Sequence, residues 1–224
     1  MPTWRRSRGR RVPADKGPRI LDISPTVSPR TGVFPGDTPF SRDVLLSIDG
    51  GANLDLSTIR TTVHVGAHAD APSHYKGGAA SIESRELWRY YGRCQVVSVP
   101  GTRGRRVLPD DIKVPITAPR VLLHTGSFPD PDAWNADFAA LSPELIAWLH
   151  DERGVHLVGI DTPSIDPQSS KALESHQAVA ARDMAVLEGL VLGEVAPGLY
   201  TLVAFPLKLE GADASPVRAV LLAD

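Results

Sequence analysis

One short segment of the chain concentrates side chains that can bind a metal ion. Within eleven positions it holds three of the seven histidines and an aspartate, separated by residues that are almost all small or apolar: His64, His68, Asp70 and His74. Neutral imidazole and carboxylate are the ligands that zinc and similar divalent ions accept. A lone histidine on a half-buried strand is usually structural, but this clustering favours a metal site.

No single regular element can gather these four side chains. On a helix His64 and His68 would share a face, whereas Asp70 and His74 would point elsewhere. On a straight strand His64 and Asp70 would lie about 20 Å apart, although the ligands of one ion sit about 2 Å from it. Gly66 and Pro72 supply backbone freedom and a turn. The segment therefore predicts a strand end followed by a loop that wraps the metal.

Three further acidic or imidazole side chains are candidates. His176 and Glu188 lie twelve residues apart, and Glu188 sits within an apolar run. A buried carboxylate needs a salt bridge, a proton or a metal, so Glu188 is either an ion-pair partner or a ligand. Asp161 ends an apolar stretch, where it could line a pocket or cap the turn that follows it and order that loop.

The elements that must position these residues are short. Strands are expected over residues 19–23, 44–48, 55–65, 95–99, 120–124, 156–160 and 199–209, and helices over 142–152 and 171–181. Ser142 and Pro143 suit a helix start. The pattern predicts a mixed α/β fold, and a chain of 224 residues with 42% hydrophobic side chains suits one domain over 19–224. No glycine-rich nucleotide fingerprint is present.

The start of the chain differs in character. Residues 1–18 are rich in arginine, and no hydrophobic stretch follows that could complete an export signal, so we expect a basic, disordered extension. A short basic tail without interleaved aromatics beyond Trp4 argues against nucleic-acid binding. No apolar run approaches the roughly 20 residues that cross a bilayer, and Cys94 is the only cysteine. We therefore expect no membrane association and a cytoplasmic protein.

With these motifs in view, the chain resembles the cyclase-like metal-dependent hydrolases, and within them the bacterial kynurenine formamidases, or arylformamidases. The resemblance covers nearly the whole chain outside the basic extension. Its motifs are Asp-Ile-Ser-Pro at 22–25, Phe-Pro-Gly-Asp-Thr-Pro at 34–39, the histidine segment at 64–74, Asp-Thr-Pro-Ser at 161–164, Ser-His-Gln at 175–177, Leu-Glu-Gly-Leu at 187–190 and residues 213–220.

This resemblance implies a swivelling β/β/α domain, with a mixed sheet or barrel-like core and flanking helices. It implies a two-zinc site in which His64, His68 and Asp70 hold one ion while Asp70, His176 and Glu188 hold the other. His74 would then be free for acid–base catalysis. It also implies a homodimer that hydrolyses N-formyl-L-kynurenine to L-kynurenine and formate in tryptophan breakdown.

One residue departs from that pattern. The formamidases commonly have Trp where this chain has Phe34, a position that contacts substrate in the family. Phenylalanine keeps the stacking face but loses area and the indole N–H. Two alternatives follow: hydrolysis of another amide or cyclic amide such as isatin, and a non-catalytic metal-binding protein of the same fold. His74 argues against the latter, because structural metal binding does not require it.

Overall fold

The computed structural model describes residue 17 and residues 19–223. The extension expected over residues 1–18 therefore lies outside the described residues except for Gly17, and its disorder stays a prediction. Within the described part, no helix is long and apolar enough to cross a membrane.

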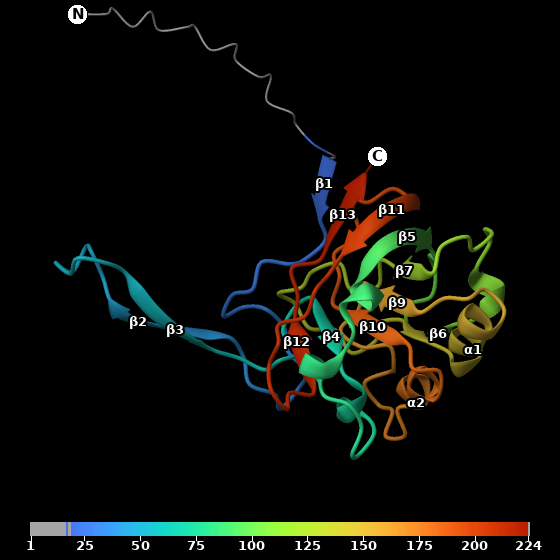
Figure 1. Cartoon of the computed structure of the whole chain (residues 1–224), viewed down its shortest axis with the longest axis horizontal. Helices are drawn as coiled ribbons and strands as arrows, with labels where there is room; N and C mark the ends of the chain where they lie inside the picture. Colours follow the sequence, from blue (N-terminus) through green and yellow to red (C-terminus); the bar gives the residue numbers. More distant parts are fainter. Residues whose placement is uncertain (1–16, 18, 224) are drawn as a thin grey trace, which may run out of the picture.

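A nine-stranded mixed sheet forms the centre of the fold, in the order β1-β13-β11-β5-β7-β9-β10-β4-β12 (Figure 1). Strands β5, β7, β9 and β10 run parallel, and the strands on either side of them pair antiparallel. The sheet contains β1 (Arg19–Asp22), β4 (His68–Asp70), β5 (Tyr91–Ser98), β7 (Arg120–His124), β9 (Leu157–Ile160), β10 (Ala185–Glu188), β11 (Gly198–Val203), β12 (Ala214–Pro216) and β13 (Val220–Ala223).

The hydrophobic core lies on both faces of this sheet. Neighbouring residues of one strand point to opposite faces, so Val96 and Leu122 belong to one buried cluster while Val97 and Val121 belong to the other. Two helices, α1 (Pro143–Asp151) and α2 (Glu174–Ala181), pack on the second cluster. The predicted mixed α/β fold is confirmed.

Both predicted helices are present. The Ser142 side chain caps α1 by accepting a hydrogen bond from the Leu145 backbone N–H at 3.0 Å, and Pro143 occupies the first turn. Helix α2 begins at Glu174, later than expected, because Leu173 adopts a left-handed conformation with φ 50° immediately before it.

A hairpin extends away from the body of the molecule (Figure 1). It consists of β2 (Ser41–Leu46) and β3 (Leu56–Arg60), which pair only with each other; we call residues 41–60 the arm. Every residue of its two strands is exposed. Its large exposed apolar side chains are Val44, Leu45, Leu46, Ile48, Leu54, Leu56 and Ile59.

Two expected strands were too long. The strand expected over residues 55–65 ends at Arg60, because the chain leaves the arm there and turns into the body. The strand expected over 199–209 ends at Val203, shortly before Pro206, which has no N–H to donate to a neighbouring strand.

The remaining elements are a pair of parallel strands and four 3-10 turns: β6 (Arg106–Val107), β8 (Ala140–Leu141), η1 (Pro72–His74), η2 (Ile82–Ser84), η3 (Leu87–Tyr90) and η4 (Pro109–Asp111).

Candidate metal centre

The histidine segment folds as a turn, a strand and a second turn. His64 lies in an irregular turn, His68 and Asp70 lie on β4, and His74 ends the 3-10 turn η1. Gly66 provides the first reversal with φ +60°. The expected order of strand then loop was therefore wrong, because β4 follows the turn that carries His64, although both the wrapping and the role of Gly66 are as expected.

Strand pairing brings Glu188 next to this segment. Strand β4 pairs antiparallel with β10, so that Glu188 stands opposite His68. Gly189, immediately after it, has φ +66°, and a Cβ there would lie 2.1 Å from the carbonyl oxygen of Gly66. Two glycines thus allow the two ligand-bearing backbones to approach closely.

The other four predicted ligands gather around Asp70. His64 Nδ1 lies 3.1 Å from its Oδ1 and His68 Nε2 lies 3.6 Å from the same oxygen. On the other side, His176 Nε2 lies 3.3 Å from its Oδ2. Glu188 reaches both sets, with Oε1 3.3 Å from His176 Nε2 and Oε2 3.2 Å from His68 Nε2. The residues form two overlapping groups able to hold a metal: His64, His68 and Asp70, and Asp70, His176 and Glu188.

The donor set fits divalent metal ions. Asp70 is buried, yet neither of its carboxylate oxygens has a hydrogen-bond partner, and His176 Nε2 has none. These atoms are only 3.1–3.6 Å from neighbouring ligand atoms, so they face one another without hydrogen-bonding geometry. Buried polar groups are almost always satisfied. Unsatisfied polar atoms that lie this close together are typical of a site built for a cation.

Electrostatics within the cluster support the same conclusion. Burial lowers the pKa of His64, but the carboxylates of Asp70 and Asp213 outweigh it and raise that pKa to about 9. Burial likewise lowers the pKa of His176, while Asp166, Asp70 and Glu188 raise it well above its usual value. Burial raises the pKa of Asp70, but the nearby imidazoles of His176 and His64 hold it well below the usual range. The site thus favours positive charge among its carboxylates.

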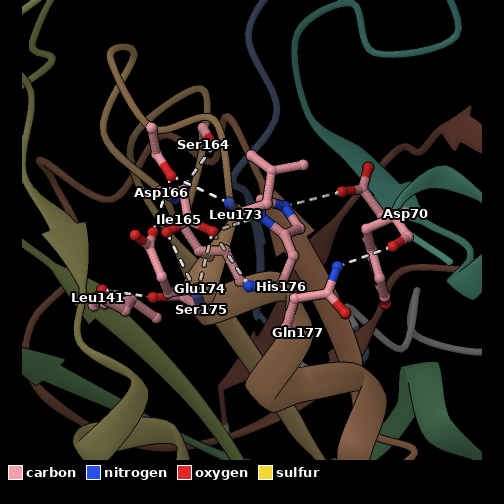
Figure 2. A network of polar contacts seen from close by, with 12 residues as sticks. Asp70, Leu141, Ser164, Ile165, Asp166, Leu173, Glu174, Ser175, His176 and Gln177 are labelled. Carbon is pink, nitrogen blue, oxygen red and sulfur yellow. Dashed lines mark hydrogen bonds and ion pairs between the residues drawn. The ribbon is translucent and has the colours of Figure 1, made fainter.

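A second carboxylate orients His176 from behind. Asp166 Oδ2 accepts a hydrogen bond from His176 Nδ1 at 2.8 Å, and the backbone N–H groups of Ser175 and His176 donate to the same carboxylate. Figure 2 shows the imidazole held between Asp166 and Asp70. With Nδ1 engaged, Nε2 faces the carboxylates, as in metal-ligating histidines backed by a carboxylate.

His74 lies beside the cluster rather than within it. Its ring centroid is 4.2 Å from that of His64, and its Nδ1 donates to Asp213 Oδ2 at 3.0 Å. The same carboxylate oxygen accepts a hydrogen bond from His64 Nε2 at 2.9 Å. His74 belongs to neither of the two groups around Asp70, but with His64 and Asp213 it forms a third, more exposed group of possible metal ligands.

A cavity of about 420 Å³ opens onto these residues. Its wall includes Phe34, which is 42% exposed and packs edge-on against Trp134 with ring centroids 5.5 Å apart. Phe128 also lines the cavity and packs edge-on against Trp134, with ring centroids 5.8 Å apart. An apolar cavity with convergent polar groups at one end is the usual form of a small-molecule site.

Of the two possibilities raised for Asp161, the structure shows the first, a place in the pocket wall, whereas the carboxylate orders a different loop from the one expected. It lines the cavity, and its carboxylate accepts hydrogen bonds from the backbone N–H groups of Thr125 and Gly126 at 2.8–3.0 Å. The loop that it orders follows β7, however, and is not the turn next to Asp161 in the sequence.

Two residues of the site were missed from the sequence. Asp166 and Asp213 lie on loops, and the residues around them in the sequence show no pattern that identifies either carboxylate as part of a site. Asp166 is ten positions from the histidine it contacts, and Asp213 is 149 positions from His64. Asp213 falls within one of the matched motifs, but a motif alone does not reveal which partner a carboxylate meets.

Comparison with known proteins agrees with this geometry. The Cyclase family model, described as "putative cyclase", matches residues 21–167. A kynurenine formamidase of Bordetella petrii is 47% identical over 205 residues, covering 91% of this chain and 97% of that protein. A solved structure described as a potential metal-dependent hydrolase with cyclase activity is 27% identical, with TM-score 0.77 over 91% of this chain and 96% of the other. Isatin hydrolase A from Labrenzia aggregata, 22% identical, shares the fold with TM-score 0.74 over 92% of this chain and 93% of that chain.

Proposed function

The chain belongs to the cyclase family, and from this premise we propose that it hydrolyses N-formyl-L-kynurenine to L-kynurenine and formate. The observation that carries the proposal is Asp70, whose two carboxylate oxygens face different histidines beside an aromatic cavity. The 47% identical kynurenine formamidase supports the choice of substrate. The proposed place of the reaction is tryptophan breakdown.

We propose two zinc ions as the cofactors. His64, His68 and Asp70 would hold one ion, and Asp70, His176 and Glu188 would hold the other, with Asp70 shared. Imidazole and carboxylate donors without thiolates suit zinc. Bound zinc ions would supply an activated water and polarisation of the formyl oxygen.

The proposed role of His74 is proton transfer. It stands beside the cluster with its Nδ1 engaged by Asp213, which leaves Nε2 available. Imidazole can accept a proton from the attacking water and return it to the aniline nitrogen, which is otherwise a poor leaving group. The buried carboxylates Asp70 and Glu188 keep positive charge at the site, where a negative oxygen develops during attack.

Phe34 is proposed to contact the aromatic ring of the substrate. The area lost by having phenylalanine at this position is partly made up by Trp134, which packs against it in the same wall. An aryl formamide therefore suits the cavity, with its ring between these side chains and its formyl group toward the histidines.

A purified-protein assay tests the proposed function. The rate of N-formylkynurenine deformylation would be measured with metal counted per chain, before and after chelation. Turnover that is lost on chelation and returns with zinc, at about two ions per chain, is expected. Isatin would be assayed alongside, because Phe34 is the residue that favours the cyclic-amide alternative. If the metal-bound protein opens isatin but does not deformylate N-formylkynurenine, the chain is a cyclic-amide hydrolase and the proposal is wrong. If the metal-bound protein has neither activity, the result favours a non-catalytic protein.

The proposed assembly is a homodimer. The arm supports this because an isolated two-stranded hairpin is marginally stable in water, and its exposed apolar side chains form a surface typical of protein contacts. Both ends of the arm connect to the site: Phe34 and Asp37, shortly before the arm in the sequence, line the cavity, and so does His64, shortly after the arm. The cytoplasmic location and the single domain over residues 19–224 stay predictions.

A further inference from the structure

Among the residues that the structure describes, Asp213 is the one carboxylate that contacts both a proposed metal ligand and the proposed acid–base residue. Its Oδ2 lies 2.9 Å from His64 Nε2 and 3.0 Å from His74 Nδ1. An ionised carboxylate can only accept hydrogen bonds. Both imidazoles must therefore place an N–H on the nitrogen that faces Asp213.

The opposite nitrogens are then fixed. With its proton on Nε2, neutral His64 presents a lone pair at Nδ1, which lies 3.1 Å from Asp70 Oδ1 in the metal group. With its proton on Nδ1, neutral His74 presents a lone pair at Nε2. One oxygen atom thus sets the tautomer of a ligand and of a base.

The backbone of Asp213 is held firmly enough for this task. Its carbonyl accepts a hydrogen bond from the Ala71 N–H at 2.8 Å, and the preceding Ala212 carbonyl accepts one from the Ile82 N–H at 2.9 Å. The next residue begins β12, where Ala214 stands opposite Asp70 on β4. The sheet that carries Asp70 therefore also positions Asp213.

We propose that Asp213 is a positioning residue that holds His64 in the tautomer for metal binding and His74 in the tautomer for proton transfer. The proposal rests on the proposed function only for the part that concerns His74. The side chain of Asp213 is 47% exposed, so its value lies in orienting the two rings rather than in global stability.

The test compares Asp213→Ala and Asp213→Asn with Glu210→Gln, which removes a carboxylate from the same loop. Zinc affinity is measured by competition with a chelator, without substrate. Loss of a carboxylate behind a metal-bound histidine typically weakens affinity about 10- to 100-fold, and we expect this range for Asp213→Ala and unchanged affinity for Glu210→Gln. Loss of zinc altogether would overturn the proposal, because Asp213 would then be a ligand. Unchanged affinity would also overturn it.

A second readout reports the tautomers directly. In zinc-loaded, ¹⁵N-histidine-labelled protein at about pH 8, the long-range ¹⁵N–¹H spectrum should show His74 protonated on Nδ1, and Asp213→Ala should shift it to a mixture. An unchanged His74 signal would overturn the proposal. In turnover, kcat should fall with KM nearly unchanged, and the unfolding temperature of the metal-free protein should not move. If the wild type deformylates nothing, the affinity and the spectrum still decide the role of Asp213.

Discussion

At the scale of single residues, protons and metal ions compete for one cluster of histidines. In the metal-free protein the pKa of His64 is raised to about 9 and that of His176 is raised well above its usual value, because carboxylates surround both rings. Both imidazoles therefore carry a proton at neutral pH. A metal ion requires the neutral ring, so binding must expel these protons.

Zinc binding should accordingly release about two protons per chain near pH 7. The affinity should fall as the pH is lowered, because the proton-bound form becomes harder to displace. The protons released on adding zinc to the metal-free protein can be counted in weak buffer. Binding that releases none at neutral pH would contradict the raised pKa values.

Removing His74 should separate catalysis from metal binding. We expect His74→Ala to keep its zinc and to lose about 10²- to 10⁴-fold in kcat, the usual contribution of a general acid or base. The matched control is His150→Ala, which removes an imidazole from the last turn of α1. Turnover equal to that of the control would remove His74 from the mechanism.

Removing the charge of Asp70 should instead abolish metal binding and catalysis together. Asp70→Asn preserves shape but takes away the carboxylate that faces both histidine sets. We expect both metal content and activity to collapse, with circular dichroism showing the fold retained. Full metal occupancy in this variant would rule out a shared Asp70.

At the scale of elements, the site depends on how closely two backbones approach. Gly189→Ala should destabilise the protein by about 1 to 3 kcal/mol through its left-handed conformation alone, and the contact with the Gly66 carbonyl adds to this. Because Glu188 and His68 flank that contact, zinc affinity should also fall. Gly193→Ala is the control, since a Cβ there meets nothing within 4 Å. Denaturant unfolding would measure both variants, and equal stability would contradict the close approach.

The elements also show where sequence reasoning succeeds. Helix α1 was predictable because its start is marked by Ser142 and Pro143, and β7 because it contains the apolar run Val-Leu-Leu at 121–123. Strand β10 was not predicted, because an apolar run with a single glutamate shows neither the alternation of a half-buried strand nor the repeat of a helix. His64, His68 and His74 were predictable as a cluster because they are neighbours in sequence, whereas Asp213 joins them only through the pairing of β12 with β4.

At the scale of the whole molecule, the exposed apolar arm is the feature that favours association with a second subunit. We expect the wild type to sediment as a dimer and the double variant Leu45→Lys/Ile59→Lys to sediment as a monomer, because both side chains are largely exposed and apolar on the arm. Ser57→Lys adds a charge to the same hairpin without removing an apolar group. A double variant that remains dimeric would place the interface elsewhere.

The contacts that build the metal centre also indicate when this centre forms during folding. His68 meets Glu188 across 120 positions, and His64 meets Asp213 across 149. Forming contacts between residues so distant along the chain costs a large loop-closure entropy, so these contacts form in slow folding steps. A zinc-sensitive dye in a refolding experiment should therefore respond late, after helix formation is complete. Tight zinc binding would then serve as a signature of a fully folded molecule, one that a collapsed intermediate lacks.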